Sequence, residues 1–316
     1  MTRGAYPATL SLDMKISFAA IVLALLALLT GCSTPAPEAR IQVAASIFPL
    51  ADITRNVGKE MADVYVLIPP GASPHTFEPS PREFKKFVNV RVFVTVGAGF
   101  EFWAEKLIKA AASESLLVVR TSQGVQMIPD VAHAHRETRL SSVGRQEGNP
   151  HIWLDPTIAK KITHQIAVAL AEVDSGHAHF YMKNANEYMS LIDSLHAEVK
   201  KAVSNFGIKE YVAFHPAWSY FARTYGLNEV GIIEESPGRQ PTPKQLKRIV
   251  EDIGKFEIKA VFSEPQLSAK AAMAIAEEAN VRVLMLDPLG GEGIPGRDSY
   301  LNLMRYNLNV MRQAME

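Results

Sequence analysis

Four residues combine side chains that bind metal ions with positions at predicted ligand-binding edges, three of them after strands and His151 directly before a predicted helix. His75 lies in SPHTFEPSP (73–81), His151 in NPHIWLDP, His215 in YVAFHP and Asp287 in VRVLMLDP. Three imidazole nitrogens and one carboxylate oxygen make a complete tetrahedral ligand set for Zn²⁺, although imidazole also binds other first-row ions. The sequence therefore predicts a site for a divalent transition metal ion. Four protein ligands would leave no open position for a catalytic water.

Prolines stiffen the chain around these candidates. Pro216 directly follows His215, and Pro288 directly follows Asp287. The residue before a proline is confined to extended backbone conformations, so both side chains should project from a rigid backbone. Three prolines within residues 73–81 give similar rigidity to the segment that carries the first histidine. We expect the ligands to be held in place before the ion arrives.

Other residues are weaker candidates. Glu78, in the first proline-rich segment, and Glu264, in FSEP at the end of a predicted strand, are candidate auxiliary ligands or cleft residues. His133 and His135 lie in the stretch 125–150, which has no sustained periodicity and is predicted to be a mobile surface insertion. These two histidines are candidates for an auxiliary zinc site, and a plain solvent-exposed loop is the simpler interpretation.

The elements that must position these residues follow a repeated order of strand, turn and helix, which is typical of parallel α/β sheets. Strands are predicted in two series, at 41–46, 63–68, 90–97 and 115–120, and at 210–215, 229–235, 259–264 and 281–287. Helices are predicted between them, including 101–113. In open parallel sheets ligands bind at the carboxyl ends of the strands. His215 and Asp287 close predicted strands, and His75 follows one by seven positions.

A long helical region separates the two series. It opens at Pro156 and breaks at Asp174-Ser175-Gly176, and its second part is about 28 residues, or roughly 40 Å, long. The predicted fold class is therefore α/β with two lobes, each a mostly parallel four-stranded sheet with helices, joined by one long backbone helix. The predicted boundaries are an N-terminal lobe at 41–155, linking helices at 156–206 and a C-terminal lobe at 207–316.

The N-terminal segment 1–32 has the features of an export signal. Lys15 precedes the apolar run Ile16 to Leu29, whose 14 residues would span roughly 21 Å as a helix. A bilayer core is about 30 Å thick, so the run fits a signal peptide better than a membrane span. Leu29-Thr30-Gly31-Cys32 resembles the bacterial lipobox, which predicts lipidation of Cys32, and 33–40 is predicted to be a tether. Met14 is an alternative start of the chain.

Composition limits the partners. Lys+Arg and Asp+Glu both total 33, so the chain lacks the basic footprint of a nucleic-acid-binding protein. Its 316 residues favour two domains. Cys32 is the only cysteine, which excludes a disulfide within the chain.

Several motifs together resemble a known family. PPGASPHTFEPSP, NPHIWLDP, YVAFHPAWSYFARTYGL, FSEPQ and LDPLGG are similar to motifs of the metal-binding lipoproteins of bacterial ABC importers for zinc and manganese, the cluster A-I solute-binding proteins. The resemblance covers nearly the whole chain after residue 40 in the same order. It implies two α/β lobes joined by a rigid helix, with metal held between them by His75, His151, His215 and Asp287.

The resemblance also implies a role. It predicts an exported monomer, anchored by lipid to a membrane facing the periplasm or cell exterior, that passes its ion to an ABC permease driven by an ATPase. A histidine at the third ligand position, here His215, goes more often with Zn²⁺ than with Mn²⁺ in this family. Manganese or iron binding is the first alternative, and a surface adhesin is the second. A zinc hydrolase is the third, for which no HExxH motif is present.

Overall fold

The computed structural model describes residues 1, 4, 40–111, 115–129, 148–235 and 239–316. Arg40 to Glu316 form one unit, and the fold described below is that of this unit. The predicted lipidation site Cys32 lies outside the described residues, as do His133, His135 and most of the predicted insertion. None of the helices in the described part is both long and apolar enough to span a bilayer.

The N-terminal lobe is built on a parallel sheet of four strands. These are β1 (Ile41–Ala45), β2 (Ala62–Val66), β3 (Val92–Thr95) and β4 (Leu117–Arg120), in the order β2-β1-β3-β4. All four residues of β3 are buried, as expected of an inner strand covered on both faces. The helices of this lobe are α2 (Phe48–Gly58), α3 (Pro81–Phe87) and α4 (Ala104–Ala111), with a short 3₁₀ turn at Lys59–Met61.

Helix α4 begins three residues later than the sequence predicts. The buried carboxylate of Glu101 folds back and accepts hydrogen bonds from the backbone N–H groups of Val96 (2.8 Å) and Gly97 (3.0 Å). These bonds hold residues 97–103 in turns, so the helix cannot begin at 101. The apolar periodicity that predicts the helix gives no sign of this contact, because the partners are backbone groups.

The C-terminal lobe repeats the pattern. Its strands are β5 (Glu210–Ala213), β6 (Asn228–Ile232), β7 (Ala260–Ser263) and β8 (Arg282–Met285), all parallel and in the order β6-β5-β7-β8. Its helices are α7 (Ser219–Tyr225), α8 (Pro243–Lys255) and α9 (Lys270–Ala279), with a 3₁₀ turn at Pro216–Trp218. Helix α8 begins at a capping box formed by Thr242 and Gln245. The predicted two-lobe α/β fold is confirmed.

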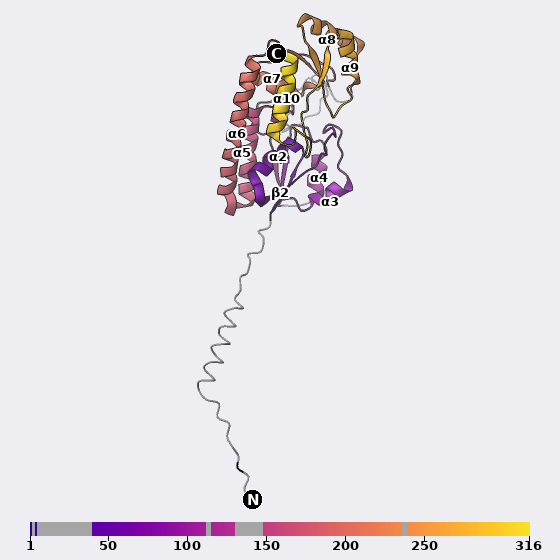
Figure 1. Ribbon diagram of the computed structural model, residues 1–316. Helices are drawn as coiled ribbons and strands as arrows, with labels where there is room; N and C mark the ends of the chain where they lie inside the picture. The colour runs from indigo at the N-terminus through magenta and orange to yellow at the C-terminus, as the bar shows by residue number, and fades with distance from the viewer. Residues whose placement is uncertain (2–3, 5–39, 112–114, 130–147, 236–238) are drawn as a thin grey trace. The chain divides into compact units, whose positions relative to one another are not determined.

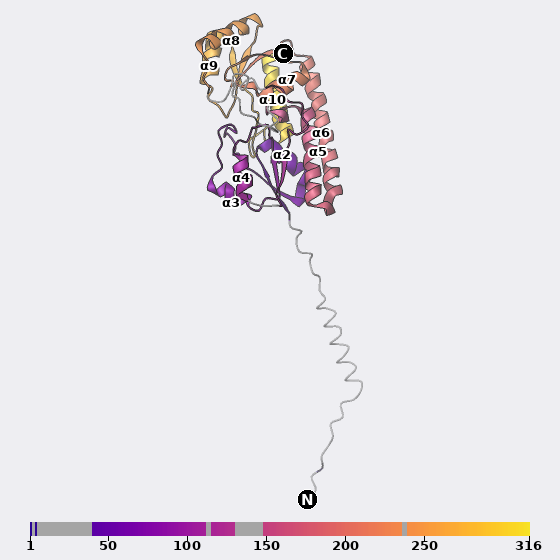
Figure 2. The same ribbon diagram turned by 180° about the vertical axis from the view of Figure 1, so that it is seen from behind.

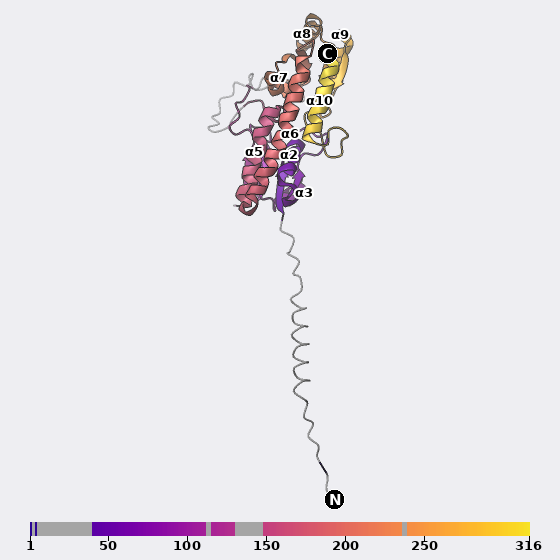
Figure 3. The same ribbon diagram turned by 60° about the vertical axis from the view of Figure 1, so that its left-hand side comes forward.

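Three long helices pack together beside the sheets. α5 (Pro156–Val173) packs against α6 (Ala178–Ser204), whose 27 residues make it about 40 Å long. The last helix, α10 (Tyr300–Met315), runs back along α6 and reaches α2 of the N-terminal lobe. Figures 1 and 2 show α5 and α6 along one side of the two sheets, and Figure 3 shows α6 and α10 side by side. The predicted linking helix is present.

Two hydrophobic clusters of different size make up the core. The larger one is continuous through the N-terminal lobe, α5, α6 and α10, and it includes Tyr211 and Phe262 of the second sheet. The smaller one fills the space between the second sheet and the helices α8 and α9; it consists of Val212, Phe214, Ile233, Ile249, Ile253, Ile258, Val261, Ala272, Ile275 and Ala276. One layer of the C-terminal lobe therefore has a core of its own.

Buried polar contacts tie the C-terminal helix to the N-terminal lobe. The carboxylate of Asp52, in α2, accepts hydrogen bonds from the backbone N–H of Tyr300 (2.9 Å) and from the hydroxyl of Tyr188 (3.1 Å). The three partners belong to α2, α10 and α6. The bond to Tyr300 satisfies one of the N–H groups that a helix start leaves without an intrahelical partner.

Candidate metal centre

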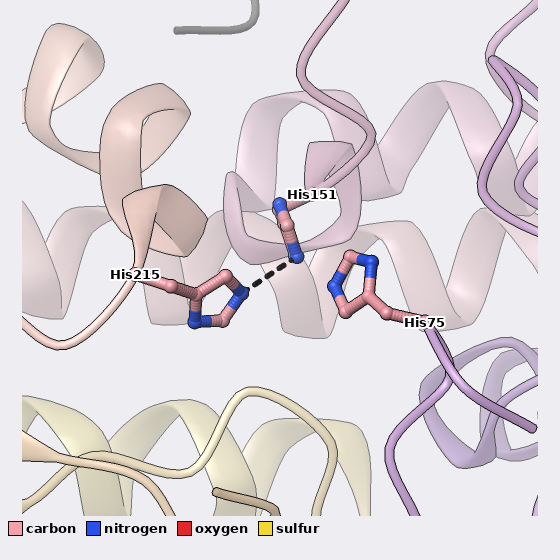
Figure 4. A group of neighbouring side chains, drawn as sticks. All are labelled: His75, His151 and His215. Carbon is pink, nitrogen blue, oxygen red and sulfur yellow. Dashed lines mark hydrogen bonds between the residues drawn. The ribbon is translucent and has the colours of Figure 1, made fainter. Parts of the chain in front are cut away.

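Three histidines from separate parts of the chain meet between the two sheets. One ring nitrogen each of His75, His151 and His215 lies within 4.8 Å of the others, and this is the group of potential metal ligands found in the described residues. Figure 4 shows the three rings turned toward a common centre. The ring centroids are 4.7 to 5.7 Å apart. The structure thus brings together three of the four predicted ligands.

His75 reaches the centre from the loop that follows β2. Pro74 beside it is buried, and the imidazole edge packs against the ring of Phe100 with 5.1 Å between centroids. Phe100 comes from the loop after β3 and also contacts His151, at 5.8 Å. An apolar ring therefore holds the two histidines of this side in place and keeps water from one face of the centre.

His151 precedes a 3₁₀ turn at Ile152–Leu154, directly before α5. The side-chain oxygen of Asn149 accepts hydrogen bonds from the His151 backbone N–H (3.0 Å) and lies 2.9 Å from its Nδ1. The Asn149 amide nitrogen donates to the carbonyl oxygen of Pro216, which fixes the amide orientation. Because the oxygen of an amide only accepts, Nδ1 of His151 carries the proton, and the neutral ring keeps its lone pair on Nε2.

His215 follows β5 with extended backbone (φ −134°, ψ 167°), as predicted for a residue before proline. Its Nδ1 lies 2.5 Å from a carboxylate oxygen of Glu264, at the end of β7. A carboxylate fixes the proton on Nδ1 in the same way and makes the other nitrogen a better electron donor. The lone pair of the neutral ring therefore lies on Nε2.

These two lone pairs face each other. Nε2 of His215 and Nε2 of His151 are 3.0 Å apart. Two acceptors at this distance repel unless a proton or a cation lies between them or beside them. In a tetrahedral zinc complex, nitrogens bound at about 2.0–2.1 Å are about 3.3 Å apart, so a small outward shift would admit the ion. The two facing nitrogens therefore favour the binding of a cation.

Burial keeps the imidazoles of His75 and His151 neutral. Removal from water, reinforced by the neighbouring His215, lowers the pKa of His75 to about 3. The same causes, together with His75, lower the pKa of His151 well below its ordinary value. Binding a cation to neutral rings requires no prior loss of a proton.

Asp287 lies near the centre but its carboxylate is engaged elsewhere. One oxygen accepts a hydrogen bond from Arg297 at 2.8 Å. The other accepts from the amide of Gln266 (2.9 Å) and from the backbone N–H groups of residues 289 and 290, each at 3.0 Å. Asp287 is not part of the three-histidine group. Its predicted role as the fourth ligand stays a prediction, and in this arrangement it would require release from Arg297.

The auxiliary candidates have different positions. Glu264 is buried and contacts His215, so it acts on a candidate ligand through the imidazole. Glu78 is exposed in the first loop and is absent from the three-histidine group.

Sequence reasoning missed three residues at this site, namely Asn149, Phe100 and Gln266. Asn149 lies within the motif NPHIWLDP and Gln266 within FSEPQ, but nothing in their spacing indicates a contact with an imidazole or a carboxylate. Their roles depend on which strand ends become neighbours. The position of His151 two residues after Asn149 is the one local signal that could have indicated the first of these contacts.

A very small cavity lies among these side chains. Its volume is about 10 Å³, and the three histidines, Phe100, Glu264 and Gln266 are among its lining residues. This is close to the space that one water molecule needs. Pockets for small-molecule ligands usually measure roughly 300–1,000 Å³. The cavity therefore fits an ion and not an organic molecule.

Comparisons with known proteins find relatives that are named for zinc. The profile of the family described as "ZnuA: Zinc-uptake complex component A periplasmic" matches residues 43–314. The zinc-binding protein AdcA of Streptococcus pyogenes serotype M1 is 28% identical over 289 residues, which cover 87% of this chain and 56% of AdcA. The high-affinity zinc uptake system protein ZnuA of Bacillus subtilis is 24% identical over 280 residues, covering 87% of this chain and 88% of that protein. The chain spans about half the length of the AdcA relatives.

Solved structures share the fold. A crystal structure of ZnuA superimposes with a TM-score of 0.76 at 29% identity, covering 87% of this chain and 99% of that one. The laminin-binding protein Lmb of Streptococcus agalactiae, described as bifunctional with adhesin and metal transporting activity, superimposes with a TM-score of 0.75 at 28% identity. The coverage is 87% of this chain and 100% of Lmb.

Proposed function

We propose, from the premise that this chain belongs to the family of the periplasmic zinc-uptake complex component A, that it captures one Zn²⁺ between its lobes for import. The observation that carries the proposal is the pair of Nε2 atoms of His151 and His215, 3.0 Å apart with their lone pairs facing each other. His75 supplies a third nitrogen to the same centre. An extracytoplasmic ion carrier needs such a preformed site, since the ion must be taken from dilute solution.

The ligand set favours zinc over manganese. Three neutral imidazoles suit Zn²⁺, whereas Mn²⁺ is better matched by carboxylate and carbonyl oxygens. Two relatives found by sequence comparison, AdcA of Streptococcus pyogenes and ZnuA of Bacillus subtilis, are named for zinc. Manganese or iron binding is the alternative within the same role, and competition between the ions distinguishes them.

Four ligands are proposed from the sequence, namely His75, His151, His215 and Asp287. For Asp287 to reach the ion, its carboxylate would have to exchange Arg297 and two backbone N–H groups for the metal. The three histidines need no such exchange.

The export and transfer steps are part of the proposal. Lipidation of Cys32 would anchor the protein outside the cytoplasmic membrane, and an ABC permease with its ATPase would receive the ion from a monomer. One relative, from Streptococcus pneumoniae, is named a zinc-binding lipoprotein. Release of the ion would require local movement of one lobe or of the loop 71–81, because α6 joins both lobes rigidly.

Catalysis is not part of the proposed function. A zinc hydrolase would have to admit a substrate next to the ion, and the cavity at the three histidines measures about 10 Å³. Assays on a panel of esters and phosphates should give no turnover with zinc-loaded protein. Turnover abolished by His75→Ala would contradict the carrier role.

Adhesion is a second candidate function. Solved structures with the same fold include proteins named for laminin binding, at 28% identity. Binding of the purified protein to immobilised laminin would support it. If binding persists in the His215→Ala variant, adhesion is independent of the ion.

The decisive experiment is metal analysis of the purified domain. The domain after residue 40 should hold one equivalent of Zn²⁺, and competition titration should place zinc ahead of manganese. His215→Ala should abolish tight binding. Absence of metal uptake, or uptake unchanged by His215→Ala, would reject the proposed function.

A further inference from the structure

The amide of Gln266 has a fixed orientation. Its nitrogen lies 2.9 Å from a carboxylate oxygen of Asp287. A carboxylate oxygen only accepts hydrogen bonds, so the NH₂ group of the amide must face it. The amide oxygen is thereby turned away from Asp287.

That oxygen lacks a partner. Oε1 of Gln266 is buried and makes no hydrogen bond with any group in the described ranges 40–111, 115–129, 148–235 and 239–316. Buried polar atoms without a partner are uncommon in folded proteins, and each requires an explanation such as an ion or a functional role. An amide oxygen with two free lone pairs is a competent ligand for a divalent cation.

The position of Gln266 connects it with the three histidines. It follows β7 by three residues, at the carboxyl end of the second sheet, and it lines the same cavity of about 10 Å³ as His75, His151 and His215. The free oxygen therefore belongs to a side chain that lines the same cavity as the three imidazoles.

Both carboxylate oxygens of Asp287 accept hydrogen bonds from the protein in this arrangement. Arg297 binds one oxygen, and two backbone N–H groups and Gln266 bind the other. The carboxylate thus orients the amide of Gln266 and holds the loop after β8. It acts on the centre through Gln266.

We infer that the side-chain oxygen of Gln266 is the fourth ligand of the ion bound by the three histidines, with Asp287 as the residue that positions it. This inference rests on the proposed function. All four ligands would then be neutral, so the bound ion would keep its double positive charge. Buried Glu264, in contact with His215, is the nearby carboxylate available to balance that charge. A neutral oxygen is a weaker ligand than a carboxylate, which favours release on delivery.

Gln266→Leu and Asp287→Asn together test the inference. Gln266→Leu removes the oxygen and keeps a side chain of similar size, and we expect zinc affinity to fall about tenfold or more. The visible absorption spectrum of the Co²⁺-loaded protein should change, because one donor is lost. Asp287→Asn should lower affinity less and leave that spectrum unchanged. The reverse pattern, in which Asp287→Asn changes the spectrum and Gln266→Leu does not, would overturn the inference.

A crystal structure of the zinc-loaded wild-type protein gives an independent answer, should Gln266→Leu fail to fold. The inference requires an oxygen of Gln266 about 2.0–2.2 Å from the ion. A carboxylate of Asp287 or a water molecule in that position would reject it. Either result leaves the proposed function standing, whereas failure of wild-type protein to bind any ion would reject both.

Discussion

The two halves of the candidate metal centre differ in the hydrophobic clusters that support them. His75 and His151 are held by loops of the N-terminal lobe, whose core continues through α5, α6 and α10. His215 and Glu264 come from the ends of β5 and β7, which pack on the large cluster through Tyr211 and Phe262 and on the small cluster under α8 and α9 through their other face. Movement of α8 and α9 would therefore disturb few contacts of the larger core. We expect the N-terminal half to hold its two histidines fixed, whereas the C-terminal half can yield on the side of α8 and α9.

Buried polar contacts add to this asymmetry. Asp52 ties α10 to α2 and α6, so the C-terminal helix belongs mechanically to the fixed half. The indole N–H of Trp153 donates to the carbonyl oxygen of Pro288 at 2.7 Å and holds the loop after β8 in the same way. None of these hydrogen bonds involves a residue of α8 or α9.

The largest effect is expected from loss of a ligand in the fixed half. His151→Ala removes a buried imidazole whose Nε2 faces His215, and zinc affinity should fall about a thousandfold or more, which corresponds to about 4 kcal/mol. Isothermal titration with a competing chelator measures the change. His164→Ala, on the exposed side of α5, is the matched control and should bind as the wild type does. Affinity within tenfold of wild type in His151→Ala would reject the site.

Truncation in each core compares the two halves directly. Ile192, in α6, belongs to the large cluster, and Ile253, in α8, belongs to the small one; both are buried. Each change to alanine should lower the stability of the region that contains it by about 2–4 kcal/mol. Ile192→Ala should lower the free energy of unfolding of the whole domain. Ile253→Ala should accelerate amide hydrogen exchange in α8 and α9 and leave exchange in α5 and α6 nearly unchanged.

If Ile253→Ala accelerates exchange in α5 and α6 as strongly as in α8, the two clusters unfold together. The proposed division between a fixed and a yielding half would then be wrong. This result would reject the division whether or not the two variants bind zinc equally well.

A smaller effect on zinc affinity is expected when both histidines have a neutral hydrogen-bond acceptor beside them. Asn149, a neutral amide, supports His151, whereas the carboxylate of Glu264 supports His215. Glu264→Gln replaces the charged acceptor by a neutral one and should lower zinc affinity about tenfold, because the imidazole becomes a weaker donor. Chelator competition at constant pH measures this. Unchanged affinity would mean that Glu264 only fills space beside His215.

The smallest effect, on the stability of the fold, is expected from a change at Asp52, whose carboxylate links α10 to α2 and α6. Burial raises the pKa of this carboxyl group in the folded protein above its value in the unfolded chain. Its contribution to stability is therefore complete below about pH 4 and is lost as pH rises through the folded pKa. Asp52→Asn, which stays neutral, should gain stability relative to wild type over that range, by on the order of 1 kcal/mol for each unit of pKa shift. Urea unfolding at pH 4 to 7 measures the difference. A difference that is constant with pH would contradict the assignment.

Sequence patterns predict the fold, and they select the three histidines that the structure brings together, because these patterns depend on local chemistry. Alternation of β-branched runs and helices predicts eight strands in two parallel sheets, and the structure has eight among its described residues. Strand ends followed by proline place His215 and Asp287 correctly at sheet edges. Rules about strand ends predict where a residue lies. They do not predict which neighbour its side chain binds.

Asp287 is the clearest example of that limit. Its pairing with Arg297 depends on the path of the loop 288–297, and its contact with Gln266 depends on β7 and β8 being adjacent. The same is true of Glu101, whose carboxylate binds backbone N–H groups in a turn before α4. Such contacts are set by tertiary structure, and the residue types alone are compatible with several partners.

Trp153 gives the protein an optical signal of its own. The indole is fully buried, its ring centroid lies 5.3 Å from that of His151, and its N–H is bonded to the loop after β8. An ion arriving at the imidazole places a double charge close to this fluorophore, and movement of the loop changes its hydrogen bond. Intrinsic fluorescence should therefore follow loading and unloading in real time without a chemical label, and Trp153→Phe should remove that component of the signal.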